Sequence, residues 1–271
     1  METEELKRLL KVGIVAALEA SEEILEVYGM DDFQVEVKED KSPLTIADKR
    51  SNARIEQHLI KTGIPILSEE GEKKSFNERK EWETLWVVDP LDGTKEFVKR
   101  NGEFTVNIAL VHNNRPVLGV IYVPIKETLY FAAENYGAYK LNINSGGKEV
   151  SGIESLVAKA TKLPSVMDKE EFVVVGSRSH MSVETHEFIN KLKKSHDRIK
   201  LVSAGSALKL CMVAEGVADI YPRFAPTMEW DIASGHAIAN EAGKRVVVHS
   251  SGNELEYNRE NLVNPWFVVK E

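Results

Sequence analysis

The sequence has a single cysteine, which excludes an intramolecular disulfide. Cys211 lies in the apolar run LKLCMVAEG, and we interpret it as a packing residue because free cysteine is commonly buried. A chain without disulfides suits a reducing compartment, so the sequence favours a cytoplasmic protein. Peripheral attachment at the inner face of the membrane is left open as a variant of this location.

A long hydrophobic run is also missing. The longest stretch without charged side chains, Phe104 to Asn114, is far shorter than the roughly 20 residues of a membrane helix. We therefore expect no integral membrane segment. Residues 1–29 carry acids from the second position and place apolar side chains at helical spacing, at Leu6, Leu10, Ile14, Leu18 and Leu25. This pattern predicts an amphipathic helix and not a signal peptide.

Positive charge is not in excess, and histidines do not cluster. The 35 basic and 43 acidic residues give a formal charge of −8 with the two signs interspersed, which argues against nucleic acid as the main partner. The seven histidines are scattered without the spacing of zinc ligands. A net-acidic protein still binds a small anion where metal cations reverse the local field.

The hydrophobic pattern that is present changes near the middle of the chain. In residues 1–141, helical patterns precede an alternating apolar and polar stretch at 105–134, which predicts an antiparallel meander. In residues 142–271, strand patterns alternate with helical ones after a polar segment at 142–170. The sequence therefore predicts an α/β fold, with an α+β N-terminal half and an α/β C-terminal half in one compact unit.

One strand pattern, LWVVDPLDGTKEF, meets two aspartates three positions apart. We expect the strand to end on Asp89 and Asp92, because Pro90 holds Asp89 extended and keeps a helix from starting early. Asp89 and Asp92 then project from one turn with the Leu91 carbonyl between them. Two carboxylates and a backbone oxygen suit Mg²⁺, which keeps several waters for a phosphate to displace. The adjacent Gly93 would let the backbone approach that phosphate.

Two further acidic positions follow apolar segments: Glu69 with Glu70 after a short strand, and Asp231 at a helix start. Each of these positions also has an ordinary structural explanation. DPLDG has the composition of a β-turn, and SEE is typical of a solvated loop. Asp231 could be a simple helix N-cap. Their combination favours a shared site, because rigid scaffolds present functional side chains where strands and helices meet loops.

The motifs WVVDPLDGT and WDIASG, the latter with Ser234 where alanine is usual, resemble the signatures of the inositol monophosphatase superfamily. The stretches LSEEG, SPLTIADK, NGEFTVNIALV, AGSALKLCMVAEG and ADIYPRF extend the resemblance over nearly the whole chain. The run DPLDGTKEFVKRNGEFTVNIAL, with GSRSH and YPRF, is most similar to the bacterial 3′(2′),5′-bisphosphate nucleotidase branch.

The resemblance implies a layered αβαβα sandwich of the sugar-phosphatase type. It implies a Mg²⁺-dependent, lithium-sensitive phosphatase that removes the 3′-phosphate of adenosine 3′,5′-bisphosphate to give AMP, which clears a by-product of sulfate assimilation. Two or three Mg²⁺ ions would be held by Glu69, Asp89, the Leu91 carbonyl, Asp92 and Asp231. Asp48 and Thr94 match the pair that orients and activates the attacking water.

The resemblance also implies a set of substrate-binding residues, namely Gly93, Thr94, Ser177, His180, Gly205, Lys209, Arg223 and Asp231. Taken alone, Lys209 would be a solvated residue on an amphipathic helix and His180 a surface residue. GSRSH, Lys209 and YPRF favour a nucleotide over the substrates of related enzymes.

Two alternatives stay open. Inositol monophosphate or fructose-1,6-bisphosphate would use the same metal site. A non-catalytic module that senses metabolites would be expected to lose at least one metal ligand or the water-activating pair, and all of these residues are present. The sequence leaves a monomer or a homodimer equally possible, and does not say whether sulfated nucleotides are also used.

Overall fold

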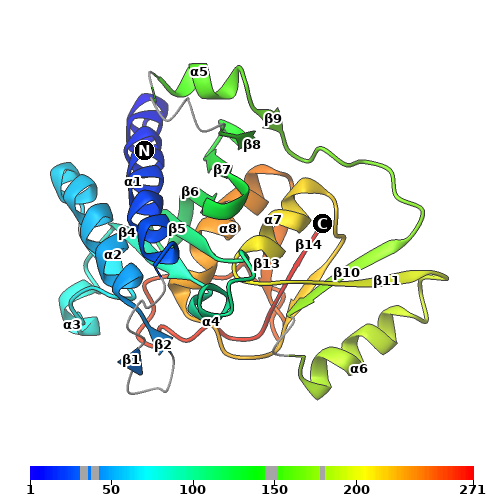
Figure 1. The fold of residues 1–271 in the computed structure, drawn as a ribbon. Helices are drawn as coiled ribbons and strands as arrows, with labels where there is room; N and C mark the ends of the chain where they lie inside the picture. Colours follow the sequence, from blue (N-terminus) through cyan, green and yellow to red (C-terminus); the bar gives the residue numbers. More distant parts are fainter. Residues whose placement is uncertain (31–35, 38–42, 144–149, 151, 178–180) are drawn as a thin grey trace.

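One long sheet dominates the N-terminal half of the protein (Figure 1). The computed structural model describes residues 1–30, 36–37, 43–143, 150, 152–177 and 181–271. Seven strands pair in the order β3-β4-β5-β6-β7-β8-β9. Their bounds are Ile66–Ser68, Thr84–Asp92, Thr105–His112, Arg115–Val123, Thr128–Ala133, Gly137–Asn142 and Thr161–Lys162. Only β3 and β4 run parallel, and β5 to β7 confirm the predicted meander.

Side chains of this sheet alternate between two cores. Trp86 and Val88 pack in the core that contains α1 (Thr3–Tyr28) and α2 (Ile46–Leu59). The neighbours of these residues, Leu85 and Val87, belong to the core that contains α7 (Leu208–Glu215) and α8 (Glu229–Glu241). Because successive strand residues point to opposite faces, a strand buried on both sides reads as the unbroken apolar run LWVV.

A second sheet lies beyond α7 and α8. Its antiparallel part has the order β12-β14-β13, and β10, which is parallel to β11, joins it through a bridge between Val174 and Ile220. The bounds are Tyr221–Arg223 for β12, Phe267–Lys270 for β14, Arg245–Val248 for β13, Phe172–Ser177 for β10 and Ile199–Ala204 for β11. Helix α6 (Val183–Leu192) covers the outer face through the core that contains Ile189 and Phe224. The layers therefore confirm the predicted αβαβα sandwich.

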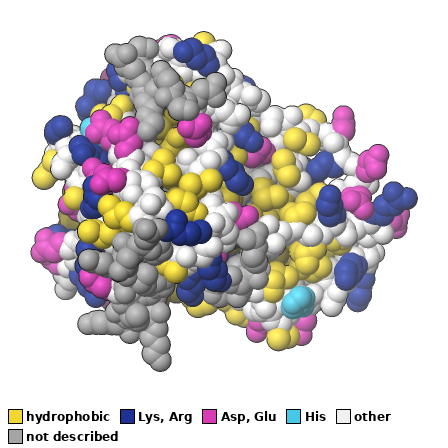
Figure 2. All heavy atoms as spheres, in the orientation of Figure 1, with side chains coloured by type: hydrophobic (Ala, Val, Ile, Leu, Met, Phe, Trp, Pro, Cys, Tyr) yellow, Lys and Arg dark blue, Asp and Glu magenta, His cyan; other side chains and the backbone are white. Residues whose placement is uncertain are grey.

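The remaining elements are short. They are β1 (Glu36–Val37), β2 (Pro43–Leu44), η1 (Ile60–Thr62), α3 (Phe76–Arg79), α4 (Thr94–Val98), η2 (Pro124–Lys126) and α5 (Ile153–Val157). No helix in the described part of the chain is both long and apolar enough to cross a membrane. Basic and acidic side chains are interspersed on the face drawn in Figure 2. The division into halves at residue 141 stays a proposal.

Strand β4 ends at Asp92, the second of the two aspartates on which we expected the strand to end. Asp89 pairs with Asn107 and Asp92 with Thr105 on β5, so three steps along β4 oppose two along β5. The extra residue forms a β-bulge, and this bulge accommodates Pro90, which has no N–H to donate. Since strand residues two apart share a face, the bulge places both carboxylates on the same side of the sheet.

Helix α8 lies against β6 with no room for a side chain between them. A Cβ atom added at Gly119 would lie 2.2 Å from the carbonyl oxygen of Ser234 and 3.0 Å from Cβ of Ala237. Atoms in a close-packed interior cannot overlap to that degree, so the spacing of helix and sheet requires glycine here. Asp231 lies in the first turn of this helix.

Candidate metal and phosphate site

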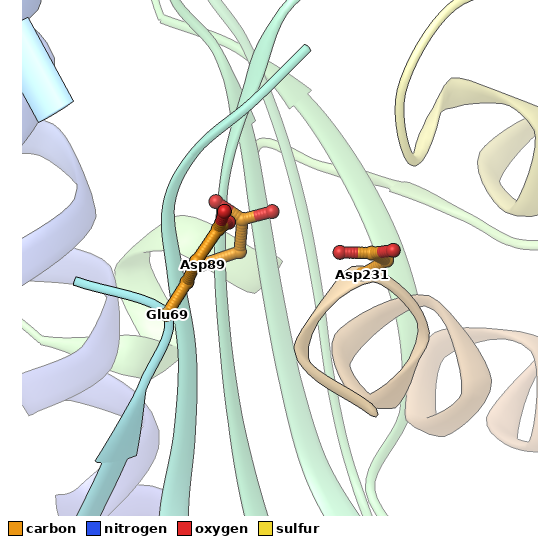
Figure 3. A group of neighbouring side chains, drawn as sticks. All are labelled: Glu69, Asp89 and Asp231. Atoms are coloured by element: carbon orange, nitrogen blue, oxygen red, sulfur yellow. The ribbon is translucent and has the colours of Figure 1, made fainter. Parts of the chain in front are cut away.

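Three carboxylates from separate elements meet at the ends of β3, β4 and α8 (Figure 3). Glu69 follows β3, Asp89 lies on β4 and Asp231 lies in the first turn of α8, and one oxygen of each is within 4.8 Å of the others. The Glu69 amide donates to the Val88 carbonyl at 3.1 Å, which continues the pairing of β3 and β4 to the carboxylate-bearing residue. Asp231 accepts from the Met228 amide at 2.8 Å and so caps the helix.

Two carboxyl groups of this cluster, those of Asp89 and Asp231, resist ionisation in the absence of a cation. Burial raises the pKa of Asp89 and of Asp231 well above the usual range, and neighbouring carboxylates raise both further. The cause is the low polarity of the site together with repulsion between like charges. A divalent cation removes both penalties, and a set made only of oxygen donors fits a hard ion such as Mg²⁺.

Asp92 lies beside this trio, and Asn107 orients it. Asn107 Nδ2 donates to Asp92 Oδ2 at 3.3 Å, and Thr105 Oγ1 donates to Asn107 Oδ1 at 2.9 Å, which fixes the orientation of the amide. Burial raises the pKa of Asp92 to about 6, although the charge of Lys209 acts in the opposite direction. Asn107 was missed at the sequence level, where its signal is a polar residue within the apolar strand TVNIALV.

Thr94 and Asp48 are hydrogen-bonded to each other. Thr94 Oγ1 donates to Asp48 Oδ1 at 3.1 Å and lies 3.4 Å from the Leu91 carbonyl oxygen. The other oxygen of Asp48 accepts from the amide and the hydroxyl of Thr45, both at 2.7 Å. Asp48 is almost fully buried. These bonds hold its carboxylate in place while it faces Thr94.

Comparison with known proteins identifies the family of this chain. The family model described as "Inositol monophosphatase family" matches residues 5–266. The chain belongs to the inositol monophosphatase family. It is 42% identical over 258 residues to the 3′(2′),5′-bisphosphate nucleotidase CysQ of Shigella flexneri, covering 93% of this chain and 96% of that protein. The protein of the same name from Haemophilus influenzae is 34% identical over 97% of this chain and 93% of its own length.

Solved structures of the family have the same architecture. CysQ from Bacteroides thetaiotaomicron superimposes with a TM-score of 0.91 at 50% identity, and 97% of each chain is covered. The Thermotoga maritima IMPase superimposes with a TM-score of 0.67 at 26% identity, covering 95% of this chain and 89% of that one. The layered sandwich and its sheet order are therefore those of the inositol monophosphatase family.

A cavity of about 130 Å³ opens beside Asp92 and Asp231. The residues predicted to bind substrate that line it are Gly93, Ser177, Gly205, Lys209, Arg223 and Asp231. Thr94 lies next to this lining, in contact with Asp48. His180 lies outside the described residues. Gly93 has a φ of +91°, in the left-handed region, so the turn into α4 favours glycine at this position.

Two cations of this cavity are buried. Lys209 is 7% exposed and its Nζ donates to the carbonyls of Ala204 at 3.3 Å and Ser206 at 2.5 Å, so the alternative of a solvated lysine is wrong. Burial lowers the pKa of Lys209 to about 8, against the opposing effect of Asp92. Arg223 is 9% exposed, and its Nη2 donates to the Pro226 carbonyl at 2.9 Å.

The Gly205 amide is already occupied. It donates to Glu103 Oε2 at 2.8 Å, so this N–H group is not free for a phosphate. A Cβ at Gly205 would lie 2.9 Å from the Glu103 carbonyl oxygen, which shows how closely the two loops approach. Glu103 fastens the 204–206 loop, one wall of the cavity, to the loop that follows α4.

Proposed function

We propose that this protein is a Mg²⁺-dependent phosphatase that removes the 3′-phosphate of adenosine 3′,5′-bisphosphate, giving AMP and phosphate. The observation that carries the proposal is the meeting of Glu69, Asp89 and Asp231 within 4.8 Å, at the edge of a cavity lined by Lys209 and Arg223. The choice of substrate is supported by the relatives named 3′(2′),5′-bisphosphate nucleotidase.

In this proposal, two or three Mg²⁺ ions are held by the carboxylates of the site and by the Leu91 carbonyl. The ligands would be Glu69, Asp89, Leu91, Asp92 and Asp231. When bound, the ions supply positive charge that offsets the repulsion between these carboxylates and an anionic substrate, and they supply Lewis acidity at the phosphate. Hydrolysis of a phosphate monoester is among the slowest uncatalysed reactions, so a large electrostatic effect is needed.

The water-activating pair follows from the direction of one hydrogen bond. Thr94 Oγ1 donates a hydrogen bond to Asp48. The lone pairs of the hydroxyl are therefore left to accept a hydrogen bond from the attacking water. As the water attacks phosphorus and the bond from phosphorus to the 3′-oxygen breaks, the water proton passes to Thr94 Oγ1 and the threonine proton passes to Asp48. The departing 3′-oxygen takes a proton from solvent water, so that AMP leaves with a free 3′-hydroxyl. The two hydrogen bonds from Thr45 orient the Asp48 carboxylate for this transfer.

The second phosphate and the nucleoside would occupy the cavity beside Asp92. Arg223 Nε and Ser206 Oγ are buried there, and neither has a hydrogen-bond partner among the described residues. Buried polar atoms in native proteins are rarely left unpaired, and an anionic, hydroxyl-bearing ligand would satisfy both. Lys209 would add a point charge for a phosphate.

Phosphate-release rates test the proposal directly. At saturating Mg²⁺ we expect adenosine 3′,5′-bisphosphate to give a kcat/KM at least about tenfold above those of inositol 1-phosphate and fructose-1,6-bisphosphate, since each 1.4 kcal/mol of differential transition-state binding is tenfold. Faster turnover of either competitor would replace the proposed substrate, and no Mg²⁺-dependent turnover of any of the three would favour a non-catalytic module. The phosphosulfate nucleotide is assayed in the same series.

Lys209→Ala separates binding of the nucleotide from the chemistry. We expect the variant to raise KM for the bisphosphate nucleotide much more than for a simple phosphate ester, because the lost contact is remote from the reacting phosphate. Equal effects on both substrates would remove Lys209 from the nucleotide pocket.

A further inference from the structure

A buried polar network joins the two segments that carry Glu69 and Asp231. It begins at Arg79, which ends α3 and is 2% exposed. The Arg79 guanidinium donates to Asn258 Oδ1 at 3.0 Å and to the carbonyls of Arg259 at 2.7 Å and Glu260 at 3.1 Å. Three hydrogen bonds thus fix a short helix of the N-terminal half to a loop near the other end of the chain.

Asn258 is the centre of the network. Its Nδ2 donates to the Arg79 carbonyl at 2.8 Å, so arginine and asparagine bond reciprocally. The Asn258 amide donates to Glu229 Oε2 at 2.7 Å. Asn258 has a φ of +58°, a left-handed conformation that asparagine tolerates better than most residues. One residue therefore touches both α3 and the first residue of α8.

Glu229 is fully buried and precedes Asp231 by two residues. Its carboxylate also accepts from the Arg259 amide at 3.1 Å and pairs with Arg259 Nε at 3.2 Å. The Glu229 amide donates to the Leu262 carbonyl at 3.0 Å, and Asn264 Nδ2 donates to the Met228 carbonyl at 2.7 Å. Burying a carboxylate is costly unless it is fully paired, and here the pairing fixes the start of α8.

One residue of the network, Arg79, and one of the carboxylate trio, Glu69, line the same groove. Glu69, Glu70, Arg79, Met228, Trp230 and Glu260 line this groove together. The loop from Glu69 to α3 forms one wall, and the first turn of α8 forms another. The network therefore lies where a change in the separation of these walls would move Glu69 relative to Asp231.

We propose that Arg79, Asn258 and Glu229 are positioning residues that set the affinity of the site for Mg²⁺. The inference rests on the metal site of the proposed function and adds to it the residues that hold two of its ligands in register. Mg²⁺ requires near-ideal octahedral geometry, so small shifts between ligands on separate elements weaken its binding. Loss of residues that orient metal ligands typically costs 10–100-fold in affinity.

Asn258→Gly is the sharpest test. Glycine adopts the left-handed conformation without strain and keeps the hydrogen bond from the backbone amide to Glu229. The substitution removes the side-chain hydrogen bonds to Arg79 and a long one, of 3.5 Å, to the Trp82 carbonyl. In the full-length protein, isothermal titration calorimetry with Mg²⁺ should give a dissociation constant about tenfold higher than that of the wild type. At Mg²⁺ concentrations that saturate each protein, KM for the nucleotide should change by less than about twofold, since the phosphate cavity is untouched.

Two companion variants exclude a general loss of stability. Arg79→Lys keeps the charge and removes the planar fork, so it should weaken Mg²⁺ binding as well, and it serves if Asn258→Gly does not fold. Asn240 lies in the last turn of α8, and its Nδ2 donates to Glu254 at 2.7 Å. Asn240→Ala removes this hydrogen bond and should leave Mg²⁺ affinity unchanged.

The outcomes are distinguishable. If the wild type binds Mg²⁺ and Asn258→Gly or Arg79→Lys binds it with the same affinity, the positioning role alone is refuted. The same conclusion follows if Asn240→Ala weakens Mg²⁺ binding as much as the network variants do. Absence of Mg²⁺ binding by the wild type would refute the proposed function and this inference with it. A rise in the dissociation constant that follows the network variants and spares Asn240→Ala would support it.

Discussion

Asp92→Asn should stabilise the metal-free protein while it abolishes turnover. Asp92 is half-buried, and burial raises its pKa from 3.8 to about 6, so ionisation of this carboxyl opposes folding when no cation is present. Asparagine has nearly the same shape, and its Oδ1 can still accept the hydrogen bond from Asn107. The substitution therefore removes a charge and retains the local packing.

The pKa difference gives the size and sign of the effect. Each unit is worth about 1.4 kcal/mol, so ionised Asp92 costs about 3 kcal/mol. Because the folded-state pKa is raised, the folded protein binds more protons than the unfolded chain between about pH 4 and 6, and the stability of the metal-free wild type falls as pH rises through that window. The variant lacks this loss. For a chain of this size, about 3 kcal/mol corresponds to a Tm difference of roughly 5–10 °C.

The assay is thermal unfolding in EDTA at pH 4.5 and pH 7, followed by the same measurement in Mg²⁺. Asp92→Asn should melt above the wild type at pH 7 in EDTA, and the difference should shrink at pH 4.5. Added Mg²⁺ should raise the Tm of the wild type more than that of the variant. Asp168→Asn, at an exposed loop residue, removes an equal charge and serves as the control.

Two results would refute this reasoning. A metal-free Asp92→Asn that melts at or below the wild type at pH 7 would show that the charge is not penalised. A variant with full Mg²⁺-dependent turnover would show that Asp92 takes no part in the chemistry. Unfolding of the variant at both pH values would instead indicate a structural role for the carboxylate.

Three further predictions concern activity. Thr94→Ala should lower kcat about 100-fold or more with little change in KM, because the proton path to Asp48 is lost, and stopped-time phosphate assays that show equal loss in kcat and gain in KM would contradict this. Glu103→Ala should raise KM about fivefold, because the hydrogen bond from the Gly205 amide is lost. Glu103→Gln keeps an oxygen that can accept this hydrogen bond, so its KM should stay close to that of the wild type. Lithium should inhibit by competing for a Mg²⁺ position, and full activity in high lithium would exclude such competition.

The local sequence contained enough information to predict the end of β4 and to single out Asp89 and Asp92 as candidate ligands. Asp89 and Asp92 follow an apolar strand pattern, and turn and strand residues within a few positions of each other determine where their carboxylates point. The bulge itself was not predictable, because it depends on the register with Asn107 and Thr105 on the next strand. The end of the strand was therefore predictable from the local sequence, and the bulge within it was not.

Contacts between distant segments account for what was missed. Lys209 is buried by the 204–206 loop and Tyr221, and no helical pattern reports that packing. Arg79 and Asn258 are 179 residues apart, and neither stands in a motif. Strand β14 at the end of the described chain lies between β12 and β13, although sequence order would place it at an edge. Only the folded arrangement supplies these partners.

The relative positions of Asp89 and Asp231 depend on Gly119, a residue that has no side chain and takes no part in the chemistry. A single methyl group at this position would have to displace α8 or bend β6, since the Ser234 carbonyl already fills the space. Asp231 would move with the helix while Asp89 stayed with the sheet. The size of ion that fits between these carboxylates is thus determined partly in the protein interior, by the distance between the backbones of Gly119 and Ser234.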